Sequence, residues 1–295
     1  MGDDAYMLND AAAGAGETER KRLDKQFFVL NEVMEGNLLP PHIAKDISDN
    51  PAPRICDMAT GSAIWLRELA KTLPLSAELF GYDYDTSKFP KDGLPRNVKL
   101  GTADLYEPFP KEWEGTFDVV SLRLFYLAAQ KDKIFDMLRN LSKLLRPGGW
   151  FVWCDLVVGN ASMEPPSDSL FRFLKALYAY FMKAGIDTSI PIGTLRYLKE
   201  VSLVECDDKI RSLDSGVHRL EDAEWLDLSR WLFHRSIMAI GSGIVRAGRD
   251  IDGMKTQEDL DNLDINLVEG YQQSRKDSVV SGSDMGATGT LNLCF

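Results

Sequence analysis

Two spacings of apolar residues alternate along residues 54–158 of the chain. Short runs of consecutive apolar residues, typical of buried strands, are separated by stretches in which apolar residues recur every three or four positions, as on one face of a helix. One such helical stretch carries Leu66, Leu69 and Leu73 on a single face. This alternation predicts a parallel sheet with helices on both sides. The five expected strands lie at residues 54–57, 77–85, 97–105, 116–122 and 150–156.

Three longer amphipathic helices are expected from the same spacing. The first covers residues 17–35 and ends at Gly36, before the break at Pro40 and Pro41. The second precedes the fifth strand, and the third ends at Gly185. The inward faces are expected to hold Leu23, Phe27, Leu30 and Met34 in the first helix, Ile134, Leu138, Leu141 and Leu145 in the second, and Phe173, Leu174, Leu177 and Phe181 in the third.

Two further strands complete the expected sheet. Residues 201–206 are the candidate sixth strand and residues 289–295 the seventh, whereas residues 207–271 have mostly helical spacing. The prediction is an α/β fold with a seven-stranded, mostly parallel sheet and helices on both faces. Residues 1–50 are expected to form an N-terminal helical lid. Residues 51–295 then form the main domain, with helical cap insertions at about 160–200 and 207–271.

Polar residues end the first four expected strands at Asp57, Asp83, Asp104 and Ser121. The carboxyl ends of parallel strands meet at one edge of a sheet, where ligands of such folds bind. The turn after Asp57 consists of small residues and enters a helix, which is typical of a nucleotide-cofactor loop. It retains Gly61 alone of the glycines usual in such loops, so an ordinary turn between strand and helix is the alternative.

Net charge argues against a nucleic-acid partner, because the chain carries −11 and lacks a basic stripe. The basic run of Arg20, Lys21, Arg22 and Lys25 is interpreted as a solvated helix face. No apolar stretch reaches the length of a membrane span, and the four cysteines are scattered, so we expect no membrane partner and a reducing, cytoplasmic location. No histidine or cysteine pair has ligand spacing, so no metal site is expected.

The segments "DMATGSAIW", "FGYDYD", "TADLYEPFP", "FDVVSLRL" and "LLRPGGWFVWCDL" follow one another in an order that resembles the class I S-adenosylmethionine-dependent methyltransferases. The segments "YMLND", "ETERKRLDKQF" and "GNLLPPHI" resemble the methyltransferases of fungal secondary-metabolite gene clusters, a group that includes LaeA-like regulators. The resemblance implies a Rossmann-like sheet, S-adenosylmethionine as cofactor and a small-molecule substrate. It specifies neither the substrate, nor the nucleophilic atom, nor an oligomeric state.

Carried over residue by residue, the resemblance implies that the Asp57–Gly61 loop passes beneath the methionine part of the cofactor. Asp83 is then expected at the ribose and Asp104 at the adenine, and the N-terminal segment closes over the site. Two departures bear on activity: Ala59 and Ala63 replace usual glycines, and Phe27 replaces a common histidine. The full set of expected cofactor residues is Tyr6, Gln26, Asp57, Ala59, Gly61, Asp83, Tyr84, Asp104, Leu105, Ser121 and Leu122.

Substrate residues are less sharply indicated by the sequence. Tyr126 and Trp153 follow or end strands and either line a substrate pocket or belong to the core. Of the three histidines His42, His218 and His234, His218 is the candidate general base, with a structural or solvated role as the alternative for each.

Three functions follow from these observations. The first is methyl transfer to N or O of a largely apolar metabolite. The second is a cyclase, such as a pericyclase, that binds S-adenosylmethionine without transferring methyl, and the third is a LaeA-like regulatory protein. Release of S-adenosylhomocysteine separates the first from the other two.

Overall fold

A computed structural model describes residues 15–163, 168–187, 189–206, 208–214, 223–247, 254–264 and 287–294. Its strands are β1 (Arg54–Met58), β2 (Glu78–Asp83), β3 (Val98–Thr102), β4 (Phe117–Arg123), β5 (Leu145–Met163), β6 (Asp208–Asp214) and β7 (Ala287–Cys294). They form one seven-stranded sheet in the order β3-β2-β1-β4-β5-β7-β6. β1 to β5 are parallel, and β7 runs antiparallel to both β5 and β6. The predicted α/β fold with a mostly parallel sheet is confirmed.

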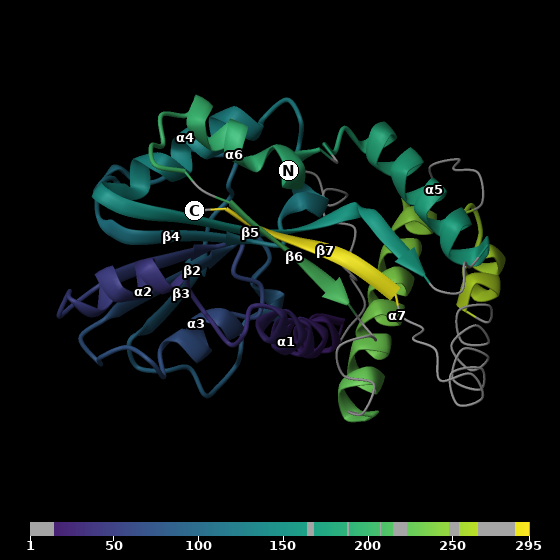
Figure 1. Cartoon of the computed structure of the whole chain (residues 1–295), viewed down its shortest axis with the longest axis horizontal. Coiled ribbons are helices and arrows are strands. Elements are labelled where there is room, and N and C mark those ends of the chain that lie inside the picture. Colours follow the sequence, from purple (N-terminus) through teal and green to yellow (C-terminus); the bar gives the residue numbers. More distant parts are fainter. Residues whose placement is uncertain are drawn as a thin grey trace.

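Helices cover both faces of this sheet (Figure 1). They are α1 (Ala15–Val33), α2 (Pro41–Ser48), α3 (Ile64–Leu69), α4 (Ile134–Leu144), α5 (Asp168–Ala184), α6 (Ile190–Glu200) and α7 (Ala223–Arg246), with 3-10 turns η1 (Thr86–Lys88), η2 (Lys111–Trp113) and η3 (Tyr126–Ala128). A further helix covers 257–264. In Figure 1, α1, α2 and α3 lie on one face, α4 and α6 lie on the other, and α5 and α7 lie beyond one end of the sheet.

The apolar spacing of the helices determines what they bury. On one face, Leu122 of β4 packs in a cluster with Met137 of α4. On the other face, Ile55 of β1 lies in a cluster with Leu30 of α1 and Leu66 of α3. All five side chains are almost fully buried, each stabilising the fold by roughly 1.5–3 kcal/mol. Helix α1 is therefore part of the core, as its predicted inward face requires.

The predicted sixth strand at residues 201–206 is wrong. Ser202 and Glu205 have φ of 66° and 54°, a left-handed conformation that an extended strand does not accommodate. The sixth strand is β6, which lies within residues predicted to be mostly helical. Its sequence, DKIRSLD, is rich in charge, and it sits at the end of the sheet, where charged residues discourage pairing with other chains. The apolar pattern is therefore a poor guide to this edge strand.

Two boundaries also differ from the predicted ones. Pro41, expected to belong to a break, is the first residue of α2, a position that needs no backbone N–H. Ile43 and Ile47 then fall one turn apart and are buried. Leu145, expected on the inner face of α4, is instead the first residue of β5 and pairs with Phe117.

Candidate functional site

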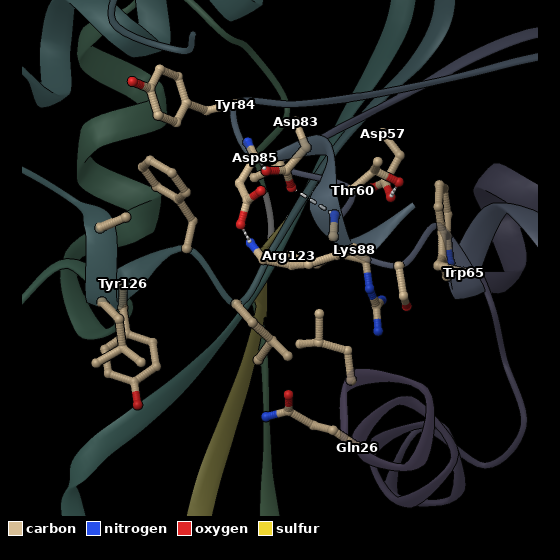
Figure 2. Close-up of a pocket in the computed structure, with 18 of the residues that line it drawn as sticks. Gln26, Asp57, Thr60, Trp65, Asp83, Tyr84, Asp85, Lys88, Arg123 and Tyr126 are labelled. Atoms are coloured by element: carbon tan, nitrogen blue, oxygen red, sulfur yellow. Dashed lines mark hydrogen bonds and ion pairs between the residues drawn. The ribbon is translucent and has the colours of Figure 1, made fainter. Parts of the chain in front are cut away.

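A pocket of about 220 Å³ lies at the carboxyl ends of the strands. Asp57, Asp83 and Arg123 reach it from the ends of β1, β2 and β4. Leu156 reaches it from the middle of β5, and Gln26 reaches it from α1. Figure 2 shows Gln26 across the pocket from Asp57 and Asp83. The edge of the sheet predicted to gather carboxylates therefore carries a cavity.

The loop after β1 contains three residues in the left-handed conformation. Ala59, Gly61 and Ala63 have φ of 55°, 56° and 56°. For alanine this costs roughly 1–2 kcal/mol because Cβ approaches the following carbonyl oxygen. At Gly61 a Cβ would also lie 3.1 Å from Cδ1 of Leu23 on α1. The loop thus has the backbone of a glycine-rich turn although two of its three special positions are alanine.

Asp57 is a buried carboxylate with one oxygen unpaired. The Thr60 hydroxyl donates to its Oδ2 at 2.6 Å, while its Oδ1 has no hydrogen-bond partner among the described residues. Ser121 is its register neighbour on β4, and the Ser121 hydroxyl is likewise buried without a partner. Burial raises the pKa of Asp57 to about 6, against the opposing effects of Thr60 and of the Arg123 charge.

Asp83 ties the end of β2 to the loop after β1. Its Oδ2 accepts from the Gly61 N–H at 2.7 Å, and its Oδ1 accepts from the Asp85 N–H at 2.9 Å. Lys88 lies 3.4 Å from Asp85, an ion pair drawn in Figure 2. Burial acts to raise the pKa of Asp85, but hydrogen bonds from Ser87 and the Lys88 charge outweigh it and hold that pKa below its usual value. Asp83 retains lone pairs for a ligand on both oxygens.

The next side of the pocket follows β3. Asp104 accepts from the Tyr106 N–H at 2.9 Å, and the residue between them in the sequence, Leu105, is buried. The Tyr106 hydroxyl donates to the Ala128 carbonyl at 2.6 Å and accepts from the Gln130 N–H at 2.8 Å. Burial raises the pKa of Tyr106 well above its ordinary value, so this hydroxyl remains a neutral link between two loops.

A fourth wall is built from the segment Leu124–Ala128, which includes η3 and lines the pocket throughout. Asp155 holds this segment, because its Oδ2 accepts from the N–H groups of Phe125 at 3.2 Å and Tyr126 at 2.9 Å. The same oxygen accepts from the Trp153 indole at 3.0 Å. Burial raises the pKa of Asp155 to about 7, although these hydrogen bonds oppose the shift.

Helix α1 brings a cation into the pocket. Arg22, predicted to face solvent, is 5% exposed and is held by Glu19 at 2.7 Å. It also donates to Gln26 at 3.2 Å. The prediction of a solvated basic face is wrong for Arg22 because the inner face of α1 carries this ion pair beside its apolar residues.

Most residues expected at the site line the pocket. These are Gln26, Asp57, Ala59, Gly61, Asp83, Tyr84, Asp104, Leu105 and Tyr126. Ser121, Leu122 and Trp153 do not line it: they are buried in β4 and β5, and Trp153 belongs to the core beside Asp155. Tyr6 and His218 lie outside the described residues. His42 and His234 do not line the pocket; His234 contacts Asp264.

Lys88, Arg123 and Asp155 were not predicted from the sequence to belong to this site. Arg123 and Asp155 each stand near the carboxyl end of an apolar run, and that position was the available signal. Lys88 offers no comparable signal, because its burial depends on how α1 packs against η1. In the described ranges, no helix is long and apolar enough to cross a membrane, and no group of three potential metal ligands occurs.

The fold and the pocket have the arrangement of ligand-binding α/β proteins, with the cavity at the carboxyl ends of the parallel strands. In sequence the chain is similar to methyltransferases of fungi. It is 27% identical to N-methyltransferase tcpN of Claviceps purpurea over 90% of this chain and 93% of the relative. It is 32% identical to N-methyltransferase verN of Clonostachys rogersoniana over 47% of this chain, a match spanning 48% of that relative.

The chain also has a distant similarity to a solved structure. A Haemonchus contortus phosphoethanolamine N-methyltransferase 2, in complex with S-adenosylhomocysteine, covers 92% of this chain and 57% of its own chain at 15% identity, with a TM-score of 0.44. No family model matches the chain.

Proposed function

We propose that the protein transfers a methyl group from S-adenosylmethionine to N or O of a small, largely apolar secondary metabolite. The observation that carries this proposal is the set of carboxylates Asp57, Asp83 and Asp104 along one pocket, at or just beyond the ends of three adjacent strands. The unpaired Oδ1 of Asp57 fits an ammonium group, and the free lone pairs of Asp83 fit a diol. The residues present therefore suit both ends of this cofactor.

In this proposal the loop Asp57–Gly61 lies beneath the methionine part, Asp83 binds the ribose, and Asp104 with Leu105 and Tyr84 meets the adenine. Ser121 and Leu122 support the loop from β4 rather than touching the ligand. Residues 1–50 act as a lid that includes Tyr6 and Gln26. This assignment is supported by α1, which packs against α3 and η1 and brings Gln26 to the pocket.

The proposed substrate end is the part of the pocket nearest η3. Tyr126, Leu127, Leu156 and Ile240 make it apolar, and Ser236 adds a hydroxyl group. Figure 2 shows Tyr126 at the opposite end of the pocket from Trp65. An apolar metabolite with a single reacting N–H or O–H suits such a lining. The N-methyltransferase names of the relatives favour nitrogen.

The chain's own contribution to the reaction is orientation and exclusion of water. S-adenosylmethionine, when bound, supplies a methyl group that is transferred by in-line displacement. The strand-end carboxylates fix one partner and the wall Leu124–Ala128 fixes the other, so that both meet in a near-attack arrangement. His218 remains the proposed general base for a nucleophile that must lose a proton.

Calorimetry with S-adenosylmethionine, followed by mass spectrometry with a panel of apolar amines, amides and phenols, tests the proposal. We expect S-adenosylhomocysteine in amounts equal to a product heavier by one methylene unit. Asp83→Ala should weaken binding of S-adenosylmethionine roughly ten- to hundred-fold, while Asp136→Ala on the exposed side of α4 should leave it unchanged. A product of unchanged mass without S-adenosylhomocysteine would replace methyl transfer with the cyclase function. Absence of S-adenosylmethionine binding would contradict the proposal.

A further inference from the structure

Three cations of the described part of the chain line the pocket, and they differ in their protein partners. Arg22 is held by Glu19 at 2.7 Å, and Lys88 lies 3.4 Å from Asp85. Arg123, at the end of β4, forms no ion pair or hydrogen bond within the described residues. Its Cζ is 5.9 Å from the ring centroids of both Phe27 and Trp65.

This environment makes Arg123 a receptor for an anion. The aromatic rings of Phe27 on α1 and Trp65 on α3 flank the guanidinium without supplying a negative charge. A planar group with five donors and no acceptor matches a carboxylate. Figure 2 shows Arg123 in the interior of the pocket, on the side toward Trp65. A ligand anion would supply the hydrogen-bonded partner that the guanidinium lacks among the described residues.

The neighbouring Asp57 presents the complementary charge. It is close enough for the Arg123 charge to affect its ionisation, and its Oδ1 is buried without a partner in the described part of the chain. A cation receptor and an anion receptor thus stand side by side at the ends of β1 and β4, which are hydrogen-bonded neighbours. A group carrying an ammonium and a carboxylate on one carbon matches this pair.

We propose that Arg123 binds the carboxylate of the amino-acid end of S-adenosylmethionine, while Asp57 binds its ammonium. This inference rests on the proposed function and adds to it a specific residue and a direction for the cofactor. The sulfonium is thereby directed along the pocket toward η3. The role that the resemblance gave to Ser121 and Leu122 at the amino-acid end passes to Arg123 in this proposal.

Decarboxylated S-adenosylmethionine, which keeps the ammonium and lacks the carboxylate, tests the inference by calorimetry. Wild type should bind S-adenosylmethionine about ten- to hundred-fold more tightly than the decarboxylated probe, because a charge-assisted pair is lost. In Arg123→Met the two affinities should become equal, at the level of the decarboxylated probe on wild type. Arg123→Lys should recover part of the difference. Arg139→Met, on the exposed side of α4, should behave as wild type.

Each outcome bears on one of the two proposals. Equal wild-type affinities for the two ligands would overturn the role of Arg123 and leave the proposed function standing. An Arg123→Met protein that loses affinity for both ligands alike would also overturn it, because the arginine would then support the pocket without meeting the carboxylate. If Arg123→Met does not fold, the wild-type comparison and Arg123→Lys still decide. If wild type binds neither ligand, the proposed function is contradicted, and this inference is contradicted with it.

Discussion

At the scale of single residues, Asp57, the proposed partner of the cofactor's ammonium group, lowers the stability of the fold. The residue is 2% exposed, and burial raises the pKa of its carboxyl group from 3.8 to about 6. A group whose pKa is raised on folding destabilises the folded state once pH exceeds both values, and this effect disappears below the unfolded pKa. The destabilisation of the folded state amounts to about 3 kcal/mol above pH 7, and it is absent below about pH 4.

We therefore expect Asp57→Asn to be more stable than wild type at pH 8 and to lose that advantage near pH 4. Asparagine can still accept the Thr60 hydrogen bond but carries no charge to bury. Urea unfolding of both proteins at the two pH values measures the difference. Asp155, whose pKa is also raised, is present in both proteins, so its contribution to the pH dependence of stability cancels in the comparison. Parallel pH profiles would contradict the prediction.

At the scale of elements, the loop between β1 and α3 stores strain in two alanines. Ala59 and Ala63 adopt positive φ, so glycine at either position should stabilise the protein by about 0.5–1 kcal/mol despite its larger entropy loss. Ala70, with φ of −59° at the end of α3, is the matched control, and Ala70→Gly should destabilise the protein. Urea unfolding midpoints compare the three variants. Destabilisation by all three would show that the alanine loop is unstrained.

The wall Leu124–Ala128 gives a second prediction at this scale. Asp155→Asn places an amide among four N–H donors, so at least one donor loses its acceptor and the wall shifts. We expect KM for the methyl acceptor to rise several-fold while affinity for S-adenosylmethionine changes little, because the strand-end carboxylates are untouched.

Asp118→Asn provides the control for that experiment. Asp118 is also buried and accepts from the Arg54 N–H at 2.7 Å and from Asn50 at 3.0 Å, at the opposite ends of the strands. The Asp118→Asn substitution should lower the unfolding temperature without changing KM for the methyl acceptor. A KM unchanged in Asp155→Asn, or raised equally in Asp118→Asn, would show that Asp155 stabilises the fold in general.

How much the sequence predicts differs among these elements. The parallel strands and their terminal carboxylates were predictable because continuous apolar runs and strand-end acids are local signals. The environment of Arg123 was not predictable, because Phe27 and Trp65 reach it from two other elements. Strand β6 was not, because its pairing with β7 compensates for a weak apolar pattern. The features that could not be predicted from the sequence are therefore those that depend on tertiary contacts.

At the scale of the whole molecule, β7 lies between β5 and β6 and is paired on both sides. Leu291 of β7 is in register with Arg211 of β6, so proline at these two positions forms a matched pair. Leu291→Pro should cost at least about 1 kcal/mol more than Arg211→Pro, because β7 has neighbours on both sides whereas β6 is at the edge. Urea unfolding measures both, and equal losses would contradict the strand order.

The same strand order constrains how the protein is made. β6 is synthesised well before β7, yet among the described strands it pairs with β7 alone. While translation continues, β5 therefore presents an unpaired edge and β6 has no partner, although the five parallel strands are already complete. Such an edge invites pairing with other nascent chains. The yield of native protein should then depend on elongation rate and on chaperones that act during translation, and more so than the stability of the finished sheet suggests.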